Sequence, residues 1–179
     1  TKLFVNDANV ADKMIVVART AKKQNPEEGI TLFLVDGKAP GVKTHLLKTM
    51  AGDKQCEVTF EKVKVGKGDI LGKADHGWEI VKKVMEWAAL AKSAEMQGGA
   101  QQVLEMTIQY GKDRIQFDRP IGSFQILQHY MADMSIDVDS ARVSLHKAAW
   151  MLSEGIPCRR ELAVIKGWLN EAYRRVTAQ

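Results

Sequence analysis

The residues best suited to ligand chemistry gather in one stretch, residues 110–134, between two segments with helical spacing. Arg114 falls where the first of these helices is expected to end, and a cation there suits the negative end of the helix dipole. Gln116 and Phe117 follow directly, and a second aromatic–amide pair ends at Gln125. A guanidinium forms paired hydrogen bonds with a phosphate, and an aromatic ring stacks on a flat ring. The stretch therefore predicts a clamp for a ligand that carries both groups.

A sharp turn is expected to hold these side chains. Pro120 and Gly122 punctuate it, and Ser123 is placed to cap the helix that follows. A plainer interpretation of each side chain stays open: Arg114 as a solvated cation at a helix end, the phenylalanines as packing of the turn, and Gln125 as a local cap. No metal site is predicted, because the histidines lack the spacing typical of one.

The elements that position this stretch fall into two parts. Residues 1–72 contain short apolar and β-branched segments separated by turn signals, without helical spacing between them. That pattern favours an antiparallel β-sandwich or barrel. The expected strands are residues 2–5, 14–17, 30–35, 42–47 and 56–65.

Residues 73–179 have helical spacing instead. Apolar residues in steps of three and four predict one long helix after Ser123, closed by Gly155, and a second seam from Leu162 to Val176. The earlier helix, residues 78–117, has two adjacent glycines near its middle, which indicates close packing or room for a ligand. We thus predict an α+β chain: a β-domain at 1–72 and an antiparallel helical bundle at 73–179, with three long helices of an expected four.

The stretch from Arg114 to Met134 resembles the flavin-binding turn of the acyl-CoA dehydrogenase family. That family has R-x-x-F-G, then P-I, F-Q and L-A-D-M, and here Asp118 stands in place of the Gly. The family's K-M-W-I-T/S-N-G segment is similar to residues 2–8. Phe4 replaces its Trp, and Asn6 replaces its Thr or Ser.

The resemblance implies most of the family's middle β-domain plus the first three helices of its C-terminal bundle. It implies FAD as cofactor, acyl-CoA as substrate, α,β-dehydrogenation of the thioester, and an electron-transfer flavoprotein or similar acceptor as partner. It also implies a homo-oligomer, dimer or tetramer, through the bundle. The chain opens on Thr1 and its helical pattern runs to Gln179, so we expect a truncated piece that is inactive alone. The FAD contacts implied are Phe4, Asn6, Arg114, Gln116, Phe117 and Gln125.

No catalytic base is assigned. The reaction needs a carboxylate that reaches the proton next to the thioester carbonyl. Most family members carry it beyond the segment that this chain resembles. One branch carries it early on the first bundle helix, followed by an Arg, and those positions are Ala88 and Ala89 here. Glu86 lies two residues earlier, about 200° around the helix, and is expected to point elsewhere.

Composition excludes other classes. The 26 Lys and Arg against 22 Asp and Glu give a charge of +4, and the basic residues are dispersed, so nucleic-acid binding is not expected. No apolar run is long enough to span a bilayer, and no signal-peptide pattern opens the sequence. Cys56 and Cys158 lie far apart and are expected to be reduced, which favours a cytoplasmic location. A flavin-dependent oxidase or monooxygenase, and a non-catalytic binding or oligomerisation module, stay open as alternatives.

Overall fold

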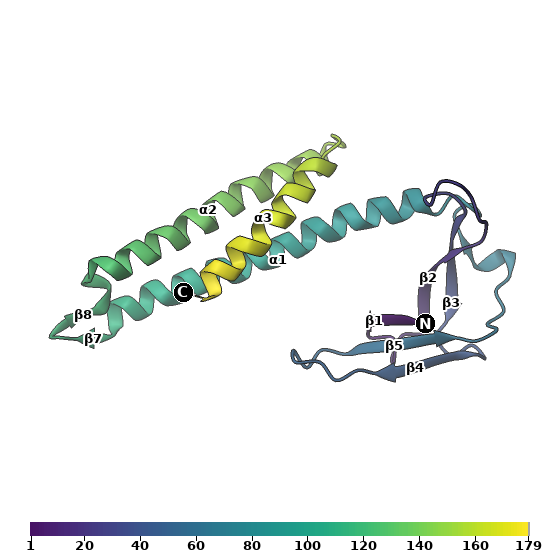
Figure 1. Cartoon of the computed structure of the whole chain (residues 1–179), viewed down its shortest axis with the longest axis horizontal. Coiled ribbons are helices and arrows are strands. Elements are labelled where there is room, and N and C mark those ends of the chain that lie inside the picture. Colours follow the sequence, from purple (N-terminus) through teal and green to yellow (C-terminus); the bar gives the residue numbers. More distant parts are fainter. Residues whose placement is uncertain (179) are drawn as a thin grey trace. The chain divides into compact units, whose positions relative to one another are not determined.

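The computed structural model describes residues 1–178, and the chain divides into two compact units (Figure 1). A β unit ends at Lys82, and a helical unit begins at Lys83. The predicted domain boundary at residue 72 stays a prediction. The elements in chain order are β1 Lys2–Asn6, β2 Lys13–Arg19, β3 Ile30–Asp36, β4 Val42–Leu46, β5 Gln55–Phe60, η1 Lys67–Asp69, β6 Ile70–Leu71, α1 Trp78–Asp113, β7 Ile115–Gln116, β8 Arg119–Pro120, η2 Ile121–Ser123, α2 Gln125–Ser153 and α3 Arg159–Ala178.

The β unit holds two three-stranded sheets, ordered β1–β5–β4 and β2–β3–β6, and every strand pairing in them is antiparallel. One buried cluster joins Met14 of β2 with Cys56 and Val58 of β5, so the two sheets share a core. The antiparallel β prediction is confirmed. β5 ends at Phe60, earlier than expected, because Lys62 takes a left-handed φ of 54° that breaks the extended chain.

A closed set of hydrogen bonds fastens the loop before α1 to the strands. The N–H of Asp75 donates to the hydroxyl of the fully buried Thr31, 2.8 Å away. The Thr20 hydroxyl lies 2.6 Å from that of Thr31 and 2.5 Å from the Asp75 carboxylate. Each hydroxyl has one proton, so Thr31 donates to Thr20 and Thr20 donates to Asp75. The ring satisfies a hydroxyl that burial would otherwise leave without a partner.

The helical unit is built from α1, α2 and α3 (Figure 1), and the predicted apolar seams of α2 and α3 are buried in it. On α2, Met134, Val138, Ala141, Leu145 and Ala148 are buried. On α3, all five seam residues from Leu162 to Val176 are buried. Two clusters form the core, and α1 contributes the buried Ala100 and Leu104 to one of them and partly buried residues to both. The predicted helical bundle is therefore confirmed, with Gly155 at a φ of +68° just after α2.

The two adjacent glycines of α1 have different surroundings. A Cβ on Gly99 would lie 2.9 Å from the ring of Tyr173, whereas a Cβ on Gly98 would meet nothing within 4 Å. Gly99 thus gives Tyr173 room to lie against α1.

On the exposed side of α3, Arg174 donates to Glu171 and the Thr177 hydroxyl donates to the Tyr173 carbonyl.

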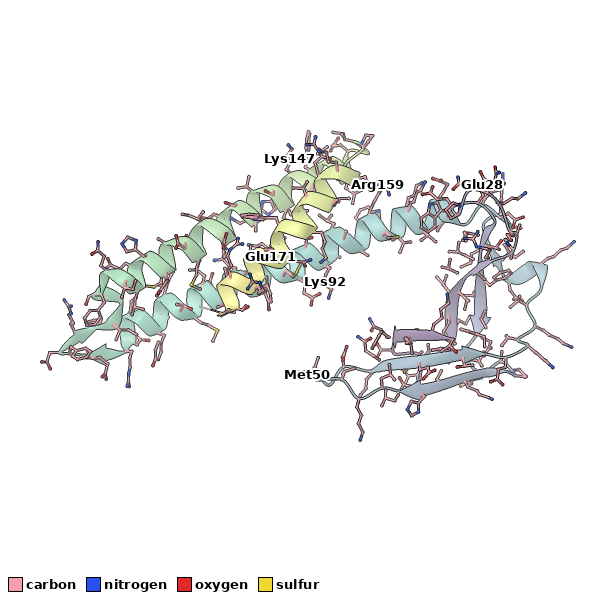
Figure 2. All side chains as sticks on the ribbon, in the orientation of Figure 1. Glu28, Met50, Lys92, Lys147, Arg159 and Glu171 are labelled. Carbon is pink, nitrogen blue, oxygen red and sulfur yellow. The ribbon has the colours of Figure 1, made fainter. Side chains whose placement is uncertain are left out.

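Exposed side chains cover both units (Figure 2). In the β unit, the labelled Met50 stands at the tip of the β4–β5 loop and is fully exposed. In the helical unit, Lys147 projects from α2 and Arg159 begins α3. Among residues 1–178, no helix combines the length and the apolar character that crossing a membrane requires.

Candidate functional site

The predicted clamp lies on a small β-hairpin that joins α1 to α2. α1 ends at Asp113, four residues earlier than predicted, and Arg114 follows it directly. The N–H of Arg114 still donates to the Tyr110 carbonyl at 2.9 Å, as in a helix. The helix stops there because Ile115 pairs with Pro120 across two short strands, which takes the backbone out of helical geometry.

The hairpin turns on Phe117 and Asp118, whose φ values are 54° and 60°. Two successive left-handed residues in a two-residue loop are the signature of a type I′ turn. Asp tolerates this region, whereas a bulky residue such as Phe rarely occupies it. The turn therefore holds an aromatic side chain at its tip in a conformation that has an energetic cost.

The Phe117 ring is 85% exposed and stands edge-on to Phe124, with 6.0 Å between the ring centroids. The guanidinium carbon of Arg119 lies 4.1 Å from the centroid of the Phe124 ring. Sequence reasoning missed Arg119. Its pairing with Gln116 across the hairpin would have revealed it, but only once the two-residue turn was recognised.

Arg114 stands at the base of the hairpin with its side chain exposed. Its guanidinium makes no hydrogen bond or ion pair with any other residue of the described range 1–178. The side-chain amide of Gln116 donates to the neighbouring carbonyl of Ile115, at 2.8 Å. The structure therefore brings Arg114, Gln116 and Phe117 together on one hairpin, with Gln125 exposed at the start of α2.

The predicted cap by Ser123 is wrong. Ser123 lies in η2, and its hydroxyl donates to the Pro120 carbonyl at 2.7 Å. The N-cap of α2 is Phe124, which has no side-chain capping bond. Ser123 directly precedes the N-cap, and its hydroxyl is used within the η2 turn by the bond to Pro120.

Phe4 and Asn6, the two predicted contacts in the β unit, lie on β1. The pairing of β1 with β5 shifts register between Lys2 and Val5, so Phe4 stands in a bulge. Its φ is 56° and its side chain is 68% exposed. Asn6 is exposed and lies opposite Gln55.

Phe4 and Phe117 therefore share two unusual properties. Within residues 1–178, they are the aromatic members of a set of six non-glycine residues with positive φ. Both are also largely exposed, so burial does not compensate for the backbone strain. Strain of this kind persists where surrounding structure imposes it, and it clusters at ligand-binding sites. The backbone geometry and exposure of Phe4 and Phe117 are therefore of the kind found at ligand-binding sites, and their contact with a ligand stays a prediction.

Glu86 lies near the loop between α2 and α3. It lines a hollow together with Trp87, Cys158 and Arg159. Burial raises the pKa of the Cys158 thiol, and the carboxylates of Glu86 and Glu161 raise it further. Both Cys56 and Cys158 are buried free thiols. No group of three His, Cys, Asp or Glu residues among those described is placed to hold a metal ion.

Comparisons with known proteins cover both units. The family model for the middle domain of acyl-CoA dehydrogenases matches residues 1–63, and that for their C-terminal domain matches residues 75–179. A short/branched chain specific acyl-CoA dehydrogenase of Bos taurus mitochondria is 34% identical over 100% of this chain and 42% of its own length.

Solved structures give the same similarity. PigA with FAD and proline superposes with a TM-score of 0.91 at 26% identity, covering 97% of this chain and 46% of PigA. The prolyl acyl carrier protein oxidase AnaB superposes with a TM-score of 0.89 at 25% identity, covering 97% and 47%. The chain thus spans about half the length of the relatives that it matches.

Proposed function

The chain belongs to the acyl-CoA dehydrogenase family, and on that premise we propose that it is part of an FAD-dependent oxidoreductase that oxidises the α,β bond of an acyl-CoA thioester. The observation that carries the proposal is the hairpin between α1 and α2. It presents the exposed Arg114 guanidinium, which has no ion partner among residues 1–178, and a strained, exposed ring at Phe117.

The residues present fit a flavin dinucleotide. FAD carries a diphosphate and two flat ring systems. An exposed arginine without an ion partner suits the diphosphate, and an exposed phenylalanine suits a ring. Gln116 and Gln125 each offer an amide that can donate and accept. Phe4 and Asn6 offer a second ring and amide in the β unit.

Bound FAD would supply the acceptor for the hydride that leaves the β-carbon of the thioester. The chain's own residues would bind and orient it. Arg114 would hold negative charge at the base of the hairpin, and Phe117 would cover a ring face. Asn6, in place of a hydroxyl, would offer both a donor and an acceptor. We assign the catalytic base to none of the described residues, because positions 88 and 89 are alanine and Glu86 faces Cys158.

A flavin-dependent oxidase is the second candidate. AnaB, an oxidase that acts on a prolyl acyl carrier protein, superposes on 97% of this chain. In that case, oxygen would take the electrons that an electron-transfer flavoprotein takes in the first proposal.

We infer a homo-oligomer through the helical unit for both candidate functions, because large apolar side chains such as Ile136, Val143 and Trp150 are exposed along α2.

Flavin spectroscopy tests the proposal. The purified protein, incubated with FAD and freed of excess, should keep a flavin absorbance band, and an acyl-CoA added without oxygen should bleach it. Bleaching that recovers quickly in air favours the oxidase, and bleaching that recovers only with an added electron acceptor favours the dehydrogenase. A protein that takes up no flavin, beside a family member treated identically that does, would contradict both.

A further inference from the structure

Gly111 and Gly122 meet at the base of the hairpin, backbone against backbone. Gly111 is buried in the last turn of α1, and Gly122 lies in η2. A Cβ on Gly122 would lie 2.9 Å from the carbonyl oxygen of Gly111 and 3.2 Å from its carbonyl carbon. Real Cβ atoms essentially never come within 3.0 Å of another group. Any side chain at position 122 therefore has to move η2 away from α1.

The hairpin is too small to fix its own direction. β7 and β8 have two residues each, and a pair of strands this short has little stability by itself. Its direction must come from the segments to which it is attached. On the α1 side, it continues directly from Arg114. On the α2 side, it continues into η2.

The bonds around the base of the hairpin run through η2. The N–H of Ile121 donates to the Arg114 carbonyl at 2.9 Å, which closes the base. The Gln128 amide donates to the Gly122 carbonyl at 3.1 Å, which ties η2 to the first turn of α2. The contact between Gly122 and Gly111 places η2 directly against the last turn of α1. The position of η2 therefore sets where the hairpin points.

We propose that Gly122 is a positioning residue for the cofactor. By lying directly on the last turn of α1, it sets the direction of the hairpin and so the placement of Arg114 and Phe117 against FAD. The ligand in this inference rests on the proposed function. The geometry at Gly122 does not, because it concerns only the helical unit.

The two glycines are not equivalent, which gives the proposal a matched pair of variants. A Cβ on Gly111 would meet the Cα of Gly122 at 3.5 Å and the Met131 sulfur at 3.7 Å, which are ordinary contacts. Alanine also suits a helix better than glycine. Gly111→Ala should therefore be tolerated, whereas Gly122→Ala should displace η2.

The experiment compares Gly122→Ala, Gly111→Ala and Gly167→Ala in the full chain, the last as a control in α3 with nothing within 4 Å. FAD affinity should fall about tenfold in Gly122→Ala alone. In the protein without FAD, hydrogen exchange at the Arg119 and Ile121 amides should accelerate in that variant, while the unfolding temperature stays near that of the wild type.

Equal FAD affinity in Gly122→Ala and the wild type, with unchanged exchange, would overturn the proposal. So would the same loss in both glycine variants, or a loss that accompanies general destabilisation. If the wild type takes up no FAD, the proposed function fails, while hydrogen exchange still decides the positioning role. If Gly122→Ala does not fold, Gln128→Ala loosens η2 without a clash. It should weaken FAD binding about two- to tenfold, and no loss in that variant would equally overturn the proposal.

Discussion

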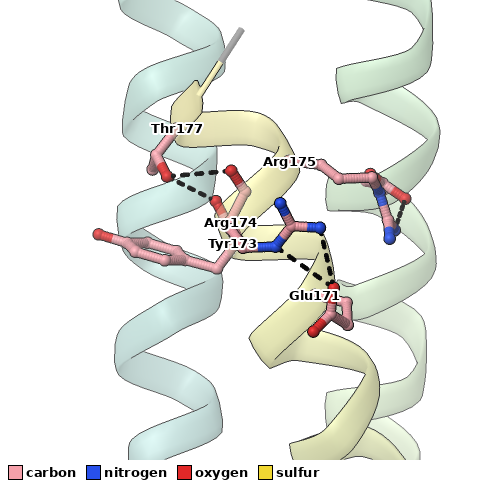
Figure 3. A network of polar contacts seen from close by, with 6 residues as sticks. Glu171, Tyr173, Arg174, Arg175 and Thr177 are labelled. Carbon is pink, nitrogen blue, oxygen red and sulfur yellow. Dashed lines mark hydrogen bonds and ion pairs between the residues drawn. The ribbon is translucent and has the colours of Figure 1, made fainter.

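Arg175 of α3 donates two hydrogen bonds to the carboxylate of Asp137 on α2, from Nε at 2.8 Å and from Nη2 at 2.7 Å. Figure 3 shows Arg175 reaching toward α2 while Tyr173, two residues earlier, reaches toward α1. The guanidinium also lies 5.1 Å from the centroid of the Trp168 ring. The Asp137 side chain is 14% exposed. The last turns of α3 therefore contact both neighbouring helices, α2 through Arg175 and α1 through Tyr173.

Arg175→Ala should lower the free energy of unfolding by about 1–3 kcal/mol, because it leaves a mostly buried carboxylate without its donor. Arg142→Ala is the control, since Arg142 pairs with Asp139 on one helix with both side chains more than half exposed, and such pairs contribute less than about 0.5 kcal/mol. Urea unfolding measures both. Equal losses in free energy of unfolding would show that the interhelical pair contributes no more to stability than the exposed pair on one helix.

Replacing Gly98 or Gly99 of α1 by alanine should change the free energy of unfolding in opposite directions. Gly98→Ala should raise the free energy of unfolding by about 0.5–1 kcal/mol, because the helix gains propensity and nothing lies within 4 Å. Gly99→Ala should lower it by about 1 kcal/mol, because the new methyl group meets the Tyr173 ring. Urea unfolding of the two variants side by side decides this. A gain in both would mean that Tyr173 moves aside at no cost.

Arg114→Ala should weaken FAD binding about tenfold to hundredfold, the loss expected for a charge-assisted contact to a diphosphate. The unfolding temperature of the FAD-free protein should hardly change, because the side chain is exposed. Lys112→Ala, which removes a nearby exposed cation, is the matched control. Full flavin occupancy of Arg114→Ala after extended dialysis would leave Arg114 as a solvated cation at a helix end.

Stability should fall at alkaline pH through Cys158. Its pKa in the folded protein is raised above the ordinary 9.0, first by burial and then by Glu86 and Glu161. A raised pKa means that this contribution to stability is complete below the ordinary value and is lost as pH rises through the folded value. Unfolding measured between pH 8 and pH 11 should decline more steeply for the wild type than for Cys158→Ala. Parallel declines would contradict the assignment.

The regular elements were predictable from sequence because their apolar residues follow the period of the structure that they form. The seam from Leu162 to Val176 is an example. The strand from Ile30 was predictable for another reason, because its run of apolar and β-branched residues is bounded by turn signals. The hairpin was not predictable in the same way. Its turn is Phe117–Asp118 rather than the Asn-Gly or Asp-Gly that usually announces a type I′ turn. Helical spacing therefore extends the predicted helix over Ile115 and Gln116, which the structure places in β7.

The site was only partly predictable for a related reason. Residue types marked Arg114 and Phe117, but the strained backbone that exposes Phe117 depends on pairing between Gln116 and Arg119. The stacking of Arg119 on Phe124 and the approach of Gly122 to Gly111 are tertiary contacts that no local pattern encodes. The roles of the six residues toward FAD stay predictions.

The pairing of β1 with β5 has a consequence for how the chain folds. Thr1 and Thr59 lie within hydrogen-bonding distance although they are 58 positions apart. β1 has to find β5 across the intervening strands β2, β3 and β4 and their loops, whereas α1 and α2 meet across a short hairpin. Long-range pairing of strands is slow, and local helical contacts form quickly. When the unfolded chain refolds, we therefore expect β1 to pair with β5 after α1 and α2 have come together.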